Sequence, residues 1–180
     1  MDEPTQTAVI VPVRQAEPAV AAHRRRLDRA ATWGVPAHVT VVFPFVPPAE
    51  VDGGLVDRLA AVVAGVPAFD CAFVDCAWFG DDVLWLAPDR AQEFRELTHA
   101  VVAQFPDHEP YGGQFAEVVP HLTVGETRQG TLADLKAAAA DVRTKLPVRA
   151  HIDHALLIAG SDRADSWRTV ARLPLGTYDD

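Results

Sequence analysis

The same order of secondary-structure elements can be read twice along this chain, and the repetition limits its possible folds more than any other feature. In each half, a strand rich in Val precedes a helix, and two further strands with a hairpin turn follow. The landmarks of the two halves are His38, Pro67, Gly80 and Trp85, and then His121, Pro147, Gly160 and Trp167. An internal duplication explains this order more simply than chance. We therefore predict one domain over residues 1–180, with repeats at roughly 30–90 and 115–175.

Hydrophobic periodicity and turn residues predict the individual elements. The expected strands cover residues 7–13, 37–45, 69–78, 83–86, 118–125, 148–159 and 167–173. The expected helices cover residues 17–31, 51–64, 89–105 and 132–142. Duplicated units commonly pack about an approximate two-fold axis, so we expect equivalent strands of the two repeats to face each other.

Two matching tripeptides lie on these equivalent strands, His38-Val39-Thr40 and His121-Leu122-Thr123. Side chains alternate along a strand, so the His and Thr of each tripeptide point to one face and the central residue points to the other. Each strand thus offers one imidazole and one hydroxyl to a shared groove. A lone strand histidine is more often structural than catalytic, but two matched tripeptides favour a functional site.

The paired residues suit chemistry at a phosphate group. An imidazole titrates near neutral pH, so one histidine can accept a proton while the other donates one. Threonine hydroxyls can donate hydrogen bonds to the non-bridging phosphoryl oxygens, where negative charge develops. This chemistry needs neither a metal nor a cofactor, and we predict none.

The residues around both tripeptides resemble the 2H phosphoesterase superfamily, also called the 2′-5′ RNA ligase-like proteins. The resemblance rests on Pro36 to Val41 with the following Phe43-Pro44-Phe45, and on Val119 to Gly125. It covers nearly the whole chain. It implies an α+β fold with two pseudo-symmetric lobes, each with an antiparallel sheet and flanking helices, around a central cleft.

The resemblance also implies an enzyme, a phosphodiesterase that hydrolyses or reversibly ligates 2′,3′-cyclic or 2′-5′ phosphodiester bonds of nucleotides or RNA ends. His38 and His121 would share the acid and base roles, and Thr40 and Thr123 would hold the phosphate. Two alternatives remain open: a nucleotide-binding or regulatory module of the same fold that turns over no substrate, and phosphoester chemistry on a nucleotide-derived metabolite.

Aromatic residues near the two tripeptides are candidates for stacking on a nucleobase. Phe45 follows the first tripeptide, and Tyr111 and Phe115 lie in a Gly-containing loop before the second. We predict that these three residues bind substrate, with core packing as the competing interpretation. Trp85 and Trp167 are more simply explained as structural residues.

The charge balance limits the partners. The chain has 16 Lys and Arg against 25 Asp and Glu, a net charge of −9, which disfavours stable binding of long nucleic acid and leaves a small nucleotide or an RNA end as substrate. We expect a monomer. The acidic start and the short apolar stretches predict neither a secretory signal nor a membrane span, and therefore a cytoplasmic protein.

The remaining reactive residues form no second site in the sequence. Cys71 and Cys76 are expected on opposite faces of one strand as buried free thiols. His151 and His154 are three residues apart on a predicted strand, which makes joint metal binding awkward. The basic run that begins at Arg24 is expected to form a solvated helix face, with at most one or two side chains able to reach a cleft.

Overall fold

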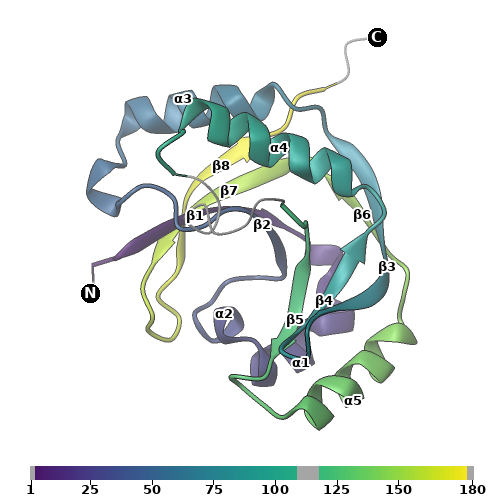
Figure 1. The fold of residues 1–180 in the computed structure, drawn as a ribbon. Coiled ribbons are helices and arrows are strands. Elements are labelled where there is room, and N and C mark those ends of the chain that lie inside the picture. The colour runs from purple at the N-terminus through teal and green to yellow at the C-terminus, as the bar shows by residue number, and fades with distance from the viewer. Residues whose placement is uncertain (1–2, 109–117, 178–180) are drawn as a thin grey trace.

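The computed structural model describes residues 3–108 and 118–177, and its strands form an eight-stranded antiparallel sheet (Figure 1). The strands are β1 (Gln6–Pro12), β2 (His38–Val42), β3 (Phe69–Phe79), β4 (Val83–Pro88), β5 (Leu122–Glu126), β6 (Val148–Ile152), β7 (His154–Gly160) and β8 (Arg168–Pro174). The helices are α1 (Glu17–Leu27), α2 (Arg29–Thr32), α3 (Gly53–Ala64), α4 (Ala91–Gln104) and α5 (Leu132–Arg143), with short 3₁₀ turns at Arg14–Ala16 and Pro48–Glu50. The strand order across the sheet is β6-β3-β4-β5-β2-β1-β7-β8.

The predicted α+β fold is confirmed, and the two expected sheets are continuous. β2 pairs with β5 at the centre of the strand order, so four strands lie on each side of this junction. Helices α3 and α4 pack on each other and on β8 and β2, respectively. Helices α1 and α5 pack on each other and on β5 and β3, respectively. In Figure 1 they lie at the bottom of the molecule, whereas α3 and α4 lie at the top. The two strands that carry the tripeptides are thereby neighbours.

The chain repeats the order strand, helix, strand after each tripeptide, as β2-α3-β3 and as β5-α5-β6. The proposed equivalence of Trp85 and Trp167 does not extend to the sheet. Trp85 lies on β4, an interior strand beside β5, whereas Trp167 precedes β8, which forms an outer edge. The repeat bounds 30–90 and 115–175 therefore remain a prediction.

The expected helix over residues 17–31 is broken at Asp28. This residue adopts extended backbone angles, φ −119° and ψ 115°, and separates α1 from α2. Its side chain accepts a hydrogen bond from the Ala30 N–H, which caps the start of α2. Asp28 also forms an ion pair with Arg24 one turn earlier, and both charged side chains are buried at this break.

The expected strand over residues 148–159 is divided in two. β6 pairs with β3 at one end of the sheet, and β7 pairs with β1 near the other end. The division falls at Asp153, whose carbonyl accepts the N–H of Leu175. The apolar residues alternate up to Ile152 and resume at Ala155, so the alternation changes phase at this point, a shift that the prediction of one continuous strand does not take into account.

Cys71 and Cys76 are both buried free thiols, but the prediction of opposite faces is wrong. The β3–β4 register shifts between Phe73 and Asp75, which inserts one extra residue on β3. Because the extra residue shifts the alternation of side chains, both cysteines lie on the face that packs on the helices. There Cys76 contacts the carbonyl of Ala139 on α5.

No helix in the described ranges combines the length and the apolar character that crossing a bilayer requires.

Candidate active site

The two His-x-Thr tripeptides meet at the centre of the sheet. Val39 of β2 and Leu122 of β5 are partners in the antiparallel pairing. That register sets His38 across from Thr123 and Thr40 across from His121. Directly opposed side chains in such a pair have Cβ atoms about 5 Å apart, and diagonal neighbours are about 7–8 Å apart. The two histidines occupy one diagonal, which leaves room for a small group between their rings.

The apolar residues between these polar groups hold the two strands in place. Val39 is 1% exposed and Leu122 is fully buried, and both belong to the main core under the helices. Because side chains alternate, burial of this pair turns the histidines and threonines to the other face of the sheet. All four polar residues are partly exposed there.

Both imidazoles are oriented by the same backbone contact. Nδ1 of His38 lies 2.7 Å from the carbonyl oxygen of Pro36, and Nδ1 of His121 lies 2.7 Å from that of Val119. A carbonyl oxygen only accepts, so each Nδ1 must carry the proton. In the neutral form each Nε2 is therefore left as the proton acceptor, and it is the nitrogen that titrates.

The surroundings favour the neutral form of both rings. The pKa of His38 is lowered to about 3, mainly by burial and also by the nearby positive charges of Arg24 and His121, while the hydrogen bond to the Pro36 carbonyl acts in the opposite direction. Burial is also the main reason that the pKa of His121 lies below its usual 6.5, although the Val119 carbonyl raises it in part. The effect of His121 on the pKa of His38 agrees with the proximity of the two histidines across the β2–β5 pair.

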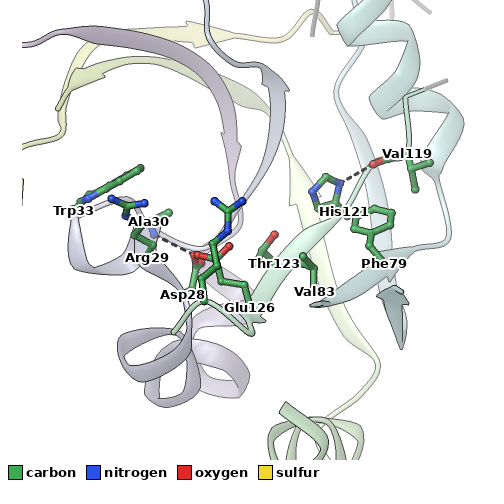
Figure 2. A pocket seen from close by; sticks show the side chains of 11 residues that line it. Asp28, Arg29, Ala30, Trp33, Phe79, Val83, Val119, His121, Thr123 and Glu126 are labelled. Carbon is green, nitrogen blue, oxygen red and sulfur yellow. Dashed lines mark hydrogen bonds between the residues drawn. The ribbon is translucent and has the colours of Figure 1, made fainter. Parts of the chain in front are cut away.

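A cavity of about 580 Å³ opens beside the second tripeptide, within the size range of small-molecule sites. Its lining residues are Asp28, Arg29, Ala30, Trp33, Phe79, Val83, Val119, His121, Thr123, Glu126 and Arg128. Figure 2 shows His121 and Phe79 at one end, Arg29 and Trp33 at the other, and Thr123 and Glu126 between them. His38 and Thr40 lie on the adjoining strand and are not among the lining residues.

The other half of this sheet face carries an apolar cluster and a second cavity, of about 610 Å³, whose lining includes Leu156, Ile158 and Trp167. Ile10 pairs with Thr40 and therefore shares its face, and it belongs to a second apolar cluster with Trp167. Trp167 packs on Trp33 with ring centroids 6.3 Å apart and on Phe43 at 6.2 Å. The cavity beside the second tripeptide lies on the side of β4 and β5, and the stacked pair of Trp33 and Trp167 lies between the two cavities.

A model of the 2′-5′ RNA ligase superfamily matches residues 11–163, a range that includes both tripeptides. The chain belongs to this superfamily. Membership confirms the resemblance to the 2H phosphoesterases and supports phosphodiester chemistry in general terms. No curated protein matches the chain.

Solved structures agree with the superfamily fold at low sequence identity. A crystal structure of E. coli LigT complexed with 3′-AMP is 15% identical, has a TM-score of 0.62, and the match covers 97% of this chain and 100% of LigT. LigT complexed with NADP+ is 16% identical with a TM-score of 0.58, covering 98% of this chain and 100% of that one. TT0787 of Thermus thermophilus is 11% identical with a TM-score of 0.62, covering 97% and 100%. At these identities the likeness establishes the fold.

Of the three aromatic residues predicted to bind substrate, only Phe45 lies in the part of the chain that the structure describes. Phe45 is 4% exposed and packs edge-on against Phe105 in the core, with ring centroids 5.1 Å apart, so we do not keep it as a substrate contact. Its burial follows from the return of the chain toward β1, where the Phe45 N–H donates to the Thr7 carbonyl. Tyr111 and Phe115 lie outside the described residues.

The sequence did not indicate the aromatic support of His121. Phe79 meets the imidazole edge-on at 5.0 Å, and Trp85 does so at 5.9 Å. Phe79 and Trp85 also stack on each other at 4.8 Å. Trp85 pairs with Thr123 across β4 and β5, so a residue interpreted as only structural contacts the candidate site. Cross-strand register, which the sequence does not give, is the information that was missing.

Arg24 also differs from its predicted place on a solvated face. It is 3% exposed, and its Nε donates to the Asp28 carboxylate at 2.9 Å. A second nitrogen of the guanidinium donates to the carbonyl of Val35 at 3.2 Å. The spacing of Arg24 and Asp28 by one helical turn was the available sequence signal. Arg25 and Arg26 are exposed, as expected.

No group of three or more potential metal ligands occurs among residues 3–108 and 118–177. His151 pairs with Asp70 at 2.7 Å, and His154 with Asp153 at 2.6 Å. These separate pairs account for the two histidines of β6 and β7 without a shared ligand.

Proposed function

We propose that this chain is a metal-independent phosphodiesterase that acts on 2′,3′-cyclic or 2′-5′ phosphodiester bonds of small nucleotides or RNA ends. The observation that carries the proposal is the matched pair of imidazoles on adjacent strands, each with Nδ1 bound to a backbone carbonyl. Binding alone would not require two rings that are both prepared to exchange a proton through Nε2. Membership of the 2′-5′ RNA ligase superfamily supports the same chemistry.

In the proposed hydrolysis, Nε2 of one histidine accepts a proton from water as the water oxygen attacks phosphorus. A new P–O bond forms, and the bond from phosphorus to one ribose oxygen breaks. The other histidine, protonated beforehand, transfers its Nε2 proton to that departing oxygen. The product is a phosphomonoester, and the two imidazoles have exchanged protonation states. Both proton transfers are supplied by side chains, so the scheme needs no metal.

Thr40 and Thr123 have the complementary role. Each hydroxyl lies opposite a histidine of the neighbouring strand, and so it can donate to a non-bridging oxygen of a phosphate held between the rings. Hydrogen bonds that strengthen as negative charge develops lower the barrier more than they strengthen ground-state binding.

The direct test is incubation of the protein with 2′,3′-cyclic nucleotides and 2′-5′ dinucleotides, followed by phosphorus NMR. We expect a phosphomonoester product that still forms in EDTA. His38→Ala and His121→Ala should each lower kcat by about 10²–10⁴-fold, the usual contribution of a general acid or base. His151→Ala is the matched control, since this histidine lies on β6 and pairs with Asp70. Full turnover by either site variant would remove that histidine from the mechanism.

The same experiment separates the alternatives. A nucleotide-binding or regulatory module would bind these nucleotides, as LigT is found complexed with 3′-AMP, but would release them unchanged. Turnover restricted to a nucleotide-derived metabolite would leave the simple cyclic nucleotides intact while the same two histidine variants abolish metabolite turnover.

A further inference from the structure

A β-bulge on β5 turns a carboxylate into the cavity beside the candidate catalytic residues. Thr123 pairs with Trp85 and Gly125 pairs with Leu84, so β5 carries one extra residue, Val124, at this point. Without the bulge, Glu126 would face the helices, because it differs from Thr123 by an odd number of positions. With the bulge it lines the cavity.

Gly125 gives independent support for this change of direction. A Cβ atom at this position would lie 2.7 Å from Cβ of Leu27 on α1 and 2.8 Å from Cδ2 of Leu135 on α5. Position 125 therefore faces the helices at close range. Glu126, the next residue, faces the other way, toward Thr123 and the cavity (Figure 2).

Glu126 is the carboxylate of the cavity with unused acceptor capacity. The other lining carboxylate, Asp28, has one oxygen bound to Arg24 and the other to the N–H of Ala30. Within the described ranges, Glu126 forms no ion pair, and the backbone N–H of Arg29 is the one donor that contacts its carboxylate. An ionised carboxylate has about four acceptor positions, so most remain available to a ligand.

The surroundings of Glu126 both raise and lower the pKa of its carboxyl group, with a net increase. Burial raises the pKa of Glu126, and the charge of Asp28 raises it further. The guanidinium groups of Arg128 and Arg29 favour the ionised form in return. The cavity thus holds a partly buried carboxylate with two cations near it, between largely apolar walls that include Phe79 and Val83.

The position of Glu126 relative to the phosphate-binding threonine matches the dimensions of a nucleoside. Three residues along a strand span roughly 10 Å, somewhat less at a bulge. A nucleotide whose phosphate contacts Thr123 and His121 can therefore bring the outer edge of its base to Glu126. A carboxylate accepts hydrogen bonds and donates none, so it selects a base edge that presents donors.

We infer that Glu126 reads the base of the substrate and selects guanine. This rests on the proposed function for the position of the phosphate. Guanine presents N1–H and the N2 amino group side by side, a match for the two oxygens of one carboxylate. Adenine and cytosine place a ring acceptor beside their amino group, and uracil flanks its N–H with two carbonyls. Each of these three edges sets a lone pair against Glu126.

The experiment compares kcat/KM for the 2′,3′-cyclic phosphates of guanosine, inosine, adenosine, cytidine and uridine. We expect guanosine to be preferred over adenosine by about 10-fold or more, the discrimination of one good bidentate contact. Inosine keeps N1–H but lacks the amino group and should fall between them. Glu126→Gln, which replaces one acceptor oxygen by a donor at nearly constant shape, should remove the preference.

Glu96→Gln is the matched control, because Glu96 is exposed on α4 and does not line the cavity. Equal use of all five substrates by the native protein, or a guanine preference that persists in Glu126→Gln, would overturn the inference. Equilibrium binding of 3′-GMP and 3′-AMP, measured by calorimetry, separates this result from failure of the proposed function. A guanine preference in binding that is lost in Glu126→Gln, without turnover of any cyclic nucleotide, would sustain base recognition and reject the proposed catalysis.

Discussion

The two site histidines differ from free histidine in a way that fixes the pH dependence of the proposed reaction. Both have a pKa below 6.5, and that of His38 is lowered to about 3. At pH 7 the ligand-free protein therefore holds both rings neutral. The proposed mechanism needs one proton on the pair, so the reactive form is populated between the two apparent pKa values of the coupled pair.

We therefore expect kcat/KM for a 2′,3′-cyclic nucleotide to follow a bell-shaped profile with its maximum on the acidic side of about pH 6.5, the value for free histidine. Above the maximum it should fall by up to about 10-fold per pH unit, because the proton is lost from the acid. The measurement is initial rate against pH at low substrate concentration, with unfolding followed in parallel. A maximum above about pH 8 would contradict the lowered pKa values.

Removal of one member of the buried Arg24–Asp28 pair gives a second prediction at the level of single residues. Their side chains are 3% and 6% exposed, so Arg24→Met leaves a carboxylate buried without its cation. The expected loss is about 3–5 kcal/mol of unfolding free energy. Denaturant unfolding measures this, with Arg25→Met as the control, because Arg25 is exposed on the same helix and should change stability by less than about 0.5 kcal/mol. Equal effects of the two substitutions would refute the buried charge pair.

Among the elements, β5 combines a catalytic candidate, a bulge and a close helix contact within five residues. Gly125 is the residue that permits the contact, since a Cβ there would lie within 3 Å of Leu27 and Leu135. Gly125→Ala should destabilise the fold by about 1–3 kcal/mol through overpacking. The control is Gly53→Ala at the start of α3, where no atom lies within 4 Å of the added Cβ. An unchanged denaturation midpoint for Gly125→Ala would show that α1 and α5 can move away from β5.

Most elements could be predicted from the sequence, because apolar periodicity and turn residues are local signals. The breaks at Asp28 and Asp153 were not predicted, because apolar periodicity alone reports neither the burial of the Arg24–Asp28 pair nor the pairing of β6 and β7 with strands near opposite ends of the sheet. The His-x-Thr residues were found because they recur. Glu126 was missed because the bulge at Val124 reverses the alternation that would have assigned it to the core.

Considered as a whole, the molecule combines a candidate site for an anionic group with an excess of acidic residues. The net charge is −9, so a polyanion is repelled at long range while a small nucleotide meets mainly the local field of the cavity and its arginines. Salt screens the long-range term over about 10 Å at 0.1 M and leaves close contacts much less affected. Substrates of different length should therefore respond differently to ionic strength.

For an RNA oligonucleotide that ends in a 2′,3′-cyclic phosphate, we expect kcat/KM relative to the cyclic mononucleotide to rise as salt increases from about 0.05 to 0.2 M, because screening relieves the repulsion of the chain. A protein that binds RNA through many phosphate contacts would show the opposite, because its affinity falls by about 10³–10⁵-fold over the same range of salt. The measurement needs both substrates in one reaction, so that any effect of salt on the catalytic step cancels in the ratio. A steep fall of the ratio with salt would reveal a basic path for RNA on this acidic protein, and the preference for small substrates would have to be abandoned.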